Sequence, residues 1–299
     1  MQGPKSVIVE DGPSPFKPAD ASPGDVQIQP SGFLLELSPD WLIVRASENI
    51  HQFLGQYHVR LIGEPLASFT LSQPLHDLRN TLSRLGGSSG IARAYRVRLI
   101  DEPRYFDIAF QLSGGRILLE GVPSPEEGVG TAIGSVGRLI EGGIGGDRNA
   151  LLEGAARRMR ALTGSDRVTI TVTTGSDEET AESSRGNFAP SERPHAPAEL
   201  PPLVCRTSAE PVCLFPRMPQ DRAPDRAILR SPTPEQLADL QEQGIQSALT
   251  VPLMRDGNVI GYFECDYRKH CEPDLEMHAA AELFAQIFAM QLRISELAS

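Results

Sequence analysis

Four cysteines carry the most reactive side chains of this sequence. Cys205 and Cys213 lie eight residues apart in an irregular stretch, Cys271 lies in a loop, and Cys265 falls on a predicted strand. Basic residues close to the loop thiols would lower their pKa and make them more reactive. Two alternatives follow: the three loop thiols are exposed and redox-active, or they are buried and inert, as we expect of the strand cysteine.

Other arrangements that could do chemistry are weaker. Arg226 and Arg230 are four residues apart, so on a helix they would share a face and could bind an anion; solvated loop cations are the alternative. No cysteine pair reads C-x-x-C and no histidine–cysteine set has zinc-finger spacing, so we expect no metal site. No G-x-S-x-G elbow or comparable catalytic constellation is present, so we expect no enzyme activity in this chain.

The charge balance limits the partners of the protein. The sequence has 28 Lys and Arg against 39 Asp and Glu, so its net charge is 28 − 39 = −11. Nucleic acids and membrane surfaces attract basic faces, so we expect neither as a partner. No apolar run is long enough to span a membrane, and the N-terminus lacks the apolar core of a secretory signal. Four cysteines are too few for a disulfide scaffold, which favours a reducing, cytoplasmic setting.

Changes in composition divide the 299 residues into two modules. Residues 1–27, rich in Pro, Gly, Ser and Asp, are expected to form an extended arm. Residues 28–122 show two strands, then helices, then a three-strand meander, which predicts a small α+β domain. Residues 123–136 are a linker by composition. Residues 137–299 again mix helices with antiparallel strands, interrupted by a long irregular region over 175–234.

Local periodicity supports these expectations. Alternating apolar residues flank the Pro39-Asp40 and Asp256-Gly257 turns, which predicts two β-hairpins. Leucines recur at intervals of three and four between Gln73 and Leu85, which predicts a helix with one apolar face.

The last predicted helix, from about Pro273 to Leu297, carries an apolar stripe. Its members are spaced 4, 3, 4 and 3 residues apart, as at the a and d positions of a coiled coil: Leu283, Ile287, Met290, Ile294 and Leu297. The stripe either faces a core or is shared between two subunits. Because it runs to the end of the chain, where no further core remains, we expect it to form a homodimer interface.

Short motifs resemble the photosensory region of bacteriophytochromes. Ile28–Leu35 reads I-Q-P-S-G-F-L-L, similar to the family's I-Q-P-H-G-x-L-L at the start of its PAS domain. Leu162–Val168 reads L-T-G-S-D-R-V, similar to the family's L-T-G-Y-D-R-V at the start of the GAF sheet. The resemblance implies an α+β fold with a PAS and then a GAF domain, each an antiparallel sheet flanked by helices. It also implies a knot, in which the N-terminal arm threads a lasso over Glu210–Arg230.

The pigment attachment site of that family is altered in this sequence. A bacteriophytochrome holds biliverdin through a cysteine in the N-terminal arm, but the first cysteine of this chain is Cys205. The family also has an Asp-Ile-Pro motif beside the pigment, and the resemblance places Glu199, Leu200 and Pro201 there. The covalent linkage known in the family therefore cannot form.

Three pocket histidines of the family are also replaced. The resemblance places Gln236 at the first, and Asp266 and Tyr267 at the other two. Burial of a bilin, which becomes cationic when protonated, depends on such hydrogen-bonding partners and counter-charges. The resemblance therefore implies a degenerate chromophore pocket, in which Arg226 and Arg230 remain as candidates to bind propionates or another anion.

The resemblance and its departures together predict a sensory and regulatory module that has lost bilin binding, with no cofactor. One alternative is a photoreceptor that binds biliverdin non-covalently, and another is a structural dimerisation module. The resemblance further implies a parent protein with a PHY domain, a histidine-kinase output and a response regulator as partner. The input would be a signal other than light, such as thiol oxidation, passing along the last helix.

Overall fold

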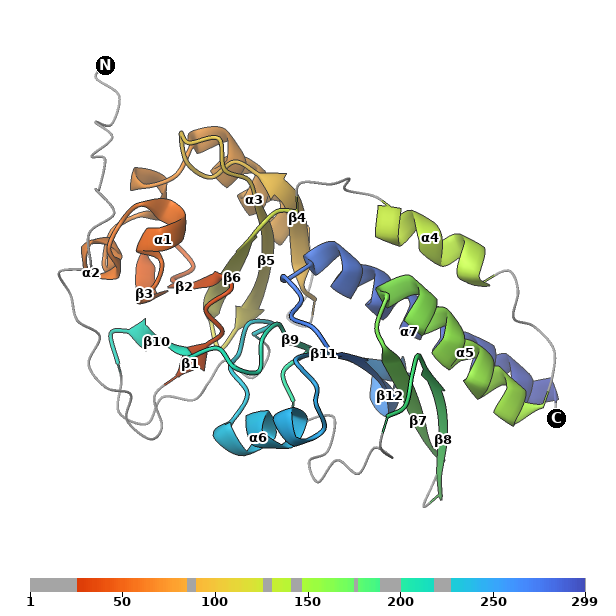
Figure 1. The fold of residues 1–299 in the computed structure, drawn as a ribbon. Helices are drawn as coiled ribbons and strands as arrows, with labels where there is room; N and C mark the ends of the chain where they lie inside the picture. The colour runs from red at the N-terminus through yellow and green to blue at the C-terminus, as the bar shows by residue number, and fades with distance from the viewer. Residues whose placement is uncertain are drawn as a thin grey trace. The chain divides into compact units, whose positions relative to one another are not determined.

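The computed structural model divides the chain into two compact units (Figure 1). The residues it describes are 26–84, 90–125, 131–140, 147–174, 177–188, 200–217 and 227–298. The first unit comprises Met1–Pro123 with Pro211–Ala227, and the second comprises Ser124–Glu210 with Ile228–Ser299. Each unit contains an antiparallel sheet with helices, which confirms the predicted α+β class.

A seven-stranded antiparallel sheet forms the first unit, in the order β1-β10-β3-β2-β6-β5-β4. Its strands are β1 (Gln27–Ile28), β2 (Phe33–Leu37), β3 (Ile43–Ser47), β4 (Ala92–Val97), β5 (Phe106–Ser113), β6 (Arg116–Pro123) and β10 (Val212–Phe215). The helices between β3 and β4 are α1 (His51–Leu54), α2 (His58–Leu61), the 3-10 helix η1 (Leu66–Ser68) and α3 (Ser72–Ser83). The β2–β3 hairpin and α3 confirm the hairpin and the helix predicted for this part of the sequence.

Phe33 organises the core of the first unit. It is fully buried, and its ring centroid lies 5.5 Å from that of Phe53 and 5.7 Å from that of Phe106. Gly121 of β6 pairs with Phe33 of β2, and a Cβ atom at position 121 would overlap the Phe33 ring. Glycine at this position therefore lets the Phe33 ring lie close against the neighbouring strand.

Strand β10 belongs to the first sheet although it comes from much later in the chain. It pairs antiparallel with both β1 and β3. Arg45 Nε donates to the carbonyl oxygen of Pro216 at 3.1 Å, and Arg217 Nη2 lies 3.1 Å from Glu48 Oε1. The predicted lasso, Glu210–Arg230, thus supplies a strand. The knot remains a prediction, because the arm that would thread the lasso lies almost wholly outside the described residues.

His58 packs against β10 and should make the first unit sensitive to acid. Its ring centroid lies 5.0 Å from that of Phe215. Burial lowers the pKa of His58 below its ordinary 6.5, the nearby Glu48 opposes this shift, and His51 adds to it. The folded state therefore favours the neutral imidazole. This contribution to stability is complete above pH 6.5 and is lost as the pH falls from there through the lower folded-state pKa.

We expect the free energy of unfolding to fall more steeply between about pH 7.5 and about pH 5.5 in the wild type than in His58→Gln. Urea unfolding followed by the fluorescence of Trp41, the single tryptophan, measures this quantity in the first unit. His76→Gln, at an exposed position of α3, is the matched control and should keep the wild-type slope. Equal slopes for the wild type and His58→Gln would contradict the assignment.

The second unit is built on a five-stranded antiparallel sheet in the order β8-β7-β12-β11-β9. Its strands are β7 (Arg167–Thr174), β8 (Asp177–Ser184), β9 (Leu203–Val204), β11 (Ser247–Arg255) and β12 (Asn258–Tyr267). Its helices are α4 (Thr131–Ile140), α5 (Arg148–Thr163), α6 (Pro234–Glu242) and α7 (Leu275–Ala298). Figure 1 shows α5 and α7 side by side, and both pack against the sheet.

Two predictions about this half of the sequence are corrected by the structure. The sequence predicts irregular structure over 175–234, but β8, β9 and β10 all lie in this region. The sequence of β8 is D-E-E-T-A-E-S-S, which lacks alternating apolar residues because the strand forms an exposed edge of the sheet. The predicted linker, 123–136, overlaps α4, which begins at Thr131.

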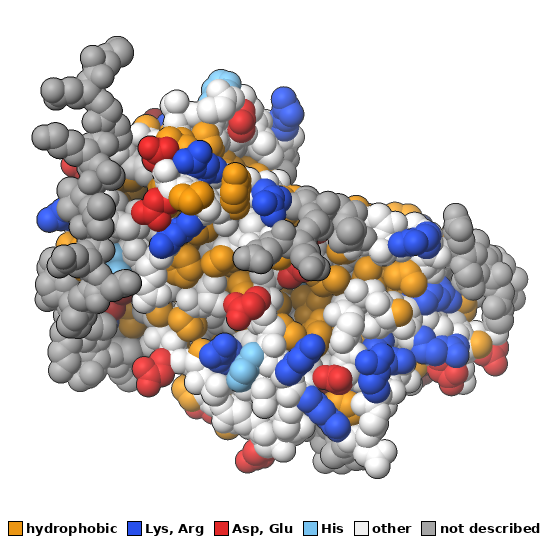
Figure 2. All heavy atoms as spheres, turned by 45° about the horizontal axis from the view of Figure 1, so that its top comes forward, with side chains coloured by type: hydrophobic (Ala, Val, Ile, Leu, Met, Phe, Trp, Pro, Cys, Tyr) orange, Lys and Arg blue, Asp and Glu red, His pale blue; other side chains and the backbone are white. Residues whose placement is uncertain are grey.

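The surface mixes charges of both signs. The face drawn in Figure 2 carries basic, acidic and apolar side chains side by side. Exposed ion pairs such as Arg98–Asp101 at 3.0 Å and Arg104–Glu102 at 3.1 Å contribute only about 0–1 kcal/mol each, so stability comes from the cores. In the part of the chain that the structure describes, no helix has the length and apolar character needed to cross a bilayer.

Candidate functional site

The sheet of the second unit has one apolar and one polar face. The apolar face packs against α7, where the ring centroid of Phe263 lies 5.9 Å from that of Phe284 and 5.8 Å from that of Phe288. The strand register places a set of polar residues on the opposite face: Arg167, Thr169, Thr250, Glu264 and Asp266. All of these are buried, so the polar face is covered as well. Buried polar groups in such a number mark this face as the candidate site.

Arg167 and Asp266 form a buried ion pair on the polar face. Nε and Nη2 of Arg167 each lie 2.8 Å from Oδ2 of Asp266, and both side chains are 1% exposed. Nη2 of Arg167 also donates to Oε1 of Gln243 at 3.4 Å. The guanidinium groups of Arg167 and Arg268 both contact the Phe188 ring, at 4.8 and 4.0 Å from its centroid. The carboxylate of Asp266, one of the predicted chromophore-pocket residues, is therefore paired with Arg167 inside the protein.

Thr169 carries a hydroxyl that has no hydrogen-bond partner among the described residues. The residue is 6% exposed, and its Oγ1 atom is buried on the polar face. A buried hydroxyl without a partner costs about 1–3 kcal/mol. A hydrogen-bonding ligand on this face would remove that cost, so Thr169 marks a point where a ligand could contact the sheet.

Tyr267 does not lie beside Asp266 in one pocket, contrary to the prediction. Successive residues of a strand point to opposite faces of the sheet, so Tyr267 lies on the helix-covered face. Its hydroxyl donates to the carbonyl oxygen of Thr163, the last residue of α5, at 3.1 Å. Burial raises the pKa of Tyr267, and the neighbouring thiols of Cys265 and Cys271 add to the effect. Tyr267 is therefore a neutral donor that fixes α5 to the sheet.

Gln236 has a structural role at the start of α6. Thr233 and Gln236 form a capping box: Thr233 Oγ1 accepts from the Gln236 backbone N–H at 3.3 Å, and Gln236 Oε1 accepts from that of Thr233 at 2.9 Å. Gln236 is also buried. Gln236 stands where the resemblance implies a histidine, and its side chain instead caps the start of its own helix.

The remaining predicted pocket residues are only partly described. Leu200 and Pro201 are buried, and Leu200 packs in a cluster with Val204, Leu240, Ile245 and Ala248. Glu199 lies outside the described residues.

Of the two predicted anion-binding arginines, the structure describes Arg230 alone. Arg230 is half-buried and lies before α6, outside any helix. Arg226 lies outside the described residues, so anion binding at this pair stays a prediction.

None of the four cysteines forms a disulfide, and most of them are buried. Cys205, Cys213 and Cys265 are buried, and Cys271 is half-buried. The structure therefore favours the buried alternative for Cys205, which directly follows β9, and for Cys213, which lies within β10. Burial raises the pKa of the Cys271 thiol, although a hydrogen bond with Ser247 acts in the opposite direction. Of the four thiols, the one at Cys271 is the most accessible to solvent.

The apolar stripe of α7 faces away from the core. Met290, Ile294 and Leu297 are 63%, 61% and 81% exposed, Leu283 is 37% exposed, and Ile287 is half-buried. A second set of residues on the opposite side of the helix forms the buried face: Ala281, Phe284, Ala285, Phe288 and Leu292. The alternative of a core-facing stripe is therefore excluded. The helix presents an apolar seam that its own unit does not cover.

Ion pairs fix the C-terminal part of α7 to the rest of its unit. Glu296 lies 3.0 Å from Arg148 Nη1 at the start of α5 and 2.7 Å from Arg255 Nη1 of β11. Burial opposes ionisation of Glu296, but the two arginines outweigh it and lower the pKa of this carboxyl group. Arg293 Nη1 lies 3.0 Å from both carboxylate oxygens of Asp256 in the β11–β12 turn. These ion pairs join this part of the helix to α5, β11 and the β11–β12 turn.

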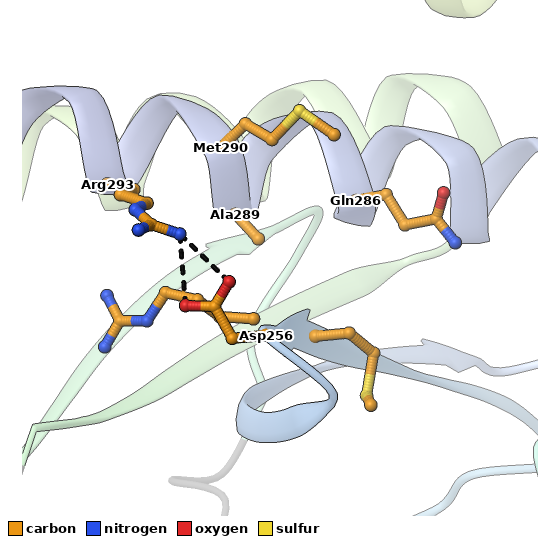
Figure 3. A pocket seen from close by; sticks show the side chains of 7 residues that line it. Asp256, Gln286, Ala289, Met290 and Arg293 are labelled. Atoms are coloured by element: carbon orange, nitrogen blue, oxygen red, sulfur yellow. Dashed lines mark hydrogen bonds and ion pairs between the residues drawn. The ribbon is translucent and has the colours of Figure 1, made fainter.

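A hollow of about 370 Å³ lies between α7 and the β11–β12 turn (Figure 3). Ala289 lines it, Met290 borders it from the helix, and the Arg293–Asp256 pair bridges the helix and the turn. None of the chromophore-pocket residues that the structure describes lines this hollow. It therefore belongs to the seam of α7 and not to the polar face of the sheet.

The structure offers no candidate metal centre in the residues it describes. No group of three or more His, Cys, Asp or Glu side chains is placed there to hold a metal ion.

Two family models match the chain. A PAS fold matches residues 24–121, and a GAF domain matches residues 147–295. The two models follow one another in the order of the two modules. No curated protein sequence matches the chain.

Solved structures of phytochrome domains resemble the chain over most of its length. The chromophore-binding domain of a Stigmatella aurantiaca phytochrome has 25% identity and a TM-score of 0.71, covering 90% of this chain and 95% of that one. A mutant of the S. aurantiaca bacteriophytochrome chromophore-binding domain has 26% identity and a TM-score of 0.72, covering 92% and 98%. A bacteriophytochrome from R. palustris has 23% identity and a TM-score of 0.76, and the chain spans 60% of its length.

Proposed function

The chain belongs to the phytochrome-like PAS–GAF proteins, and from this premise we propose that it is a sensory and regulatory module that works without bilin. The observation that supports this best is the Arg167–Asp266 pair. Position 266 corresponds to a pigment-facing histidine in the resemblance, but its carboxylate is bound to Arg167, and both side chains are 1% exposed. Separating them to admit a pigment would break the attraction between two buried charges, which is strongly unfavourable.

Two further features support the loss of bilin. Position 236 holds a glutamine that is engaged in the capping box of α6. No cysteine precedes Cys205, so the N-terminal arm has no thiol for covalent attachment. Each change by itself is compatible with pigment binding, but together with the Arg167–Asp266 pair they remove the attachment thiol and the hydrogen-bonding histidines that the resemblance implies at positions 236 and 266.

The proposed output route is α7. Its apolar seam would pair with the same seam of a second copy, because an exposed a/d stripe buries its apolar area by forming a two-stranded coiled coil. The ion pairs of Glu296 and Arg293 would couple the sheet to this paired helix. A parent protein would receive the signal in a PHY domain and a histidine kinase, with a response regulator as partner.

The proposed input is a signal other than light, and thiol oxidation is the candidate that the chain offers. Cys271 supports it, because this thiol is half-buried and lies in the segment that leads into α7.

One alternative is a photoreceptor that binds biliverdin non-covalently. The unpartnered hydroxyl of Thr169 favours it, since a buried ligand on the polar face would satisfy that group. Absorption spectroscopy after addition of biliverdin separates the two functions: a chromophore-free module loses the pigment on desalting, whereas a photoreceptor keeps a far-red band.

A purely structural dimerisation module is the third candidate, favoured by the seam of α7. It would dimerise without changing the output of the parent protein under oxidation.

A further inference from the structure

Three of the four cysteines converge at one end of the second sheet. Cys205 directly follows β9, and the Ser247 Oγ atom of β11 lies 2.6 Å from its carbonyl oxygen. Ser247 pairs with Tyr267 of β12, and Cys265 lies two residues earlier on the same face. Cys271 lies in the segment between β12 and α7. The structure thus gathers thiols that are separated by up to 66 positions in the sequence.

Cys205 and Cys271 are joined directly through their main chains. The backbone N–H of Cys271 donates to the carbonyl oxygen of Cys205 at 3.3 Å. Ser247 fixes the arrangement, since its Oγ atom also accepts from the Cys271 N–H at 2.8 Å. From standard bond lengths, two residues joined by one such N–H···O bond have Cα atoms roughly 5–6.5 Å apart. Disulfides span about 4.4–6.8 Å between Cα atoms, so the two backbones already lie at a suitable distance.

We infer that Cys205 and Cys271 form a reversible disulfide when the protein meets a peroxide. The Cys271 thiol, the more accessible of the two, reacts first: its sulfur gains one oxygen to become a sulfenic acid, and hydrogen peroxide is reduced to water. The Cys205 thiol then attacks this sulfur, the S–S bond forms, and the oxygen leaves as a second water. The two thiols lose two electrons and two protons, which the peroxide takes up.

The chemistry of Cys271 sets the pH dependence of the reaction. The thiolate is the reacting form, and burial raises the pKa of Cys271. Oxidation should therefore be slow at neutral pH and accelerate as the pH rises toward the raised pKa. Cys205 is 3% exposed and is protected from direct attack, so the order of the two steps is fixed by access.

The disulfide would act on the start of α7. Cys271 lies four residues before Leu275, where α7 begins, so the bond would tie this helix to the segment that follows β9. This deepens the proposed redox input by naming its two thiols, and it rests on the proposed function only for the role of α7 as the output. The thiol chemistry itself stands on the geometry.

The test is a thiol count on the reduced protein before and after treatment with hydrogen peroxide. Remaining thiols are alkylated in denaturant and the disulfide is mapped by peptide mass spectrometry. We expect the wild type to fall from four free thiols to two, with a Cys205–Cys271 linked peptide and no covalent dimer. Cys205→Ser and Cys271→Ser should each abolish the linked peptide. Cys213→Ser, the matched control, should fall from three free thiols to one.

Other outcomes would overturn the inference. These are a wild type that keeps all four thiols, a bond mapped to Cys265 or Cys213, or a disulfide between two copies of the chain. The wild-type map does not depend on any variant, so a variant that fails to fold leaves the test intact. If no such disulfide formed, the proposal of a chromophore-free PAS–GAF module would be unaffected. Retention of bilin, by contrast, would overturn that module without affecting the thiol map.

Discussion

Replacing Asp266 by alanine should lower the free energy of unfolding by about 3–5 kcal/mol, because it leaves the Arg167 guanidinium buried without its counter-charge. Solvent cannot compensate for the lost carboxylate, since both side chains are 1% exposed. Replacing both residues, as in Arg167→Met with Asp266→Leu, should be much milder, because no buried charge is left behind. The contrast between the single and the double variant identifies the pair as the cause.

Urea unfolding followed by far-ultraviolet circular dichroism measures these differences, since Trp41 reports on the first unit only. The matched control is Asp101→Ala, which breaks the exposed Arg98–Asp101 pair and should change stability by no more than about 1 kcal/mol. If Asp266→Ala lowered the free energy of unfolding by less than about 1 kcal/mol, the Arg167–Asp266 pair would not be the stabilising buried ion pair described above.

Placing two glutamates on the seam of α7 should convert the protein to a monomer. In Leu283→Glu with Met290→Glu, like charges would face each other across the paired helices, and such contacts cost several kcal/mol. Because about 1.4 kcal/mol corresponds to a tenfold change, we expect the dimer dissociation constant to rise by at least about 100-fold. Both positions are exposed in the single chain, so folding of the unit should be preserved.

Sedimentation equilibrium measures the dissociation constant of the wild type and the variant. Ser72→Glu with Asn80→Glu adds the same charge at exposed positions of α3 and should leave the dimer intact. A seam variant that remains dimeric would mean that another surface makes the dimer. A monomeric wild type would contradict the proposed pairing altogether.

Elements with strong local periodicity were predictable from the sequence, and elements defined by distant partners were not. The β2–β3 hairpin and the stripe of α7 carry their period in their own residues. Strand β8 has no apolar alternation, because it is an exposed edge strand rich in acidic residues. Strand β10 has four residues and pairs with β1 and β3, which lie more than 160 positions earlier in the sequence. A local sequence pattern cannot predict such a pairing.

Local roles of single residues in the candidate site could be read from the sequence, but the pairing between distant residues could not. Adjacent residues such as Asp266 and Tyr267 alternate between the two faces of a strand, and the apolar residues of β12 already indicated which face each would take. The T-P-E-Q sequence that begins at Thr233 is a capping-box signal, and it could have assigned Gln236 to the start of a helix. The Arg167–Asp266 partnership could not be predicted from spacing, since 98 residues separate the two positions and only the pairing of β7 with β12 joins them.

The most direct test of the central claim is the absorption spectrum of the protein after incubation with biliverdin and desalting. A bacteriophytochrome chromophore-binding domain carried through the same steps serves as the positive control. We predict that the chain retains no far-red band and shows no change under red or far-red illumination, because its attachment cysteine and pocket histidines are absent and Asp266 is bound to Arg167. A retained far-red band that photoconverts would contradict the claim and assign the chain to the photoreceptors that bind bilin without a covalent bond.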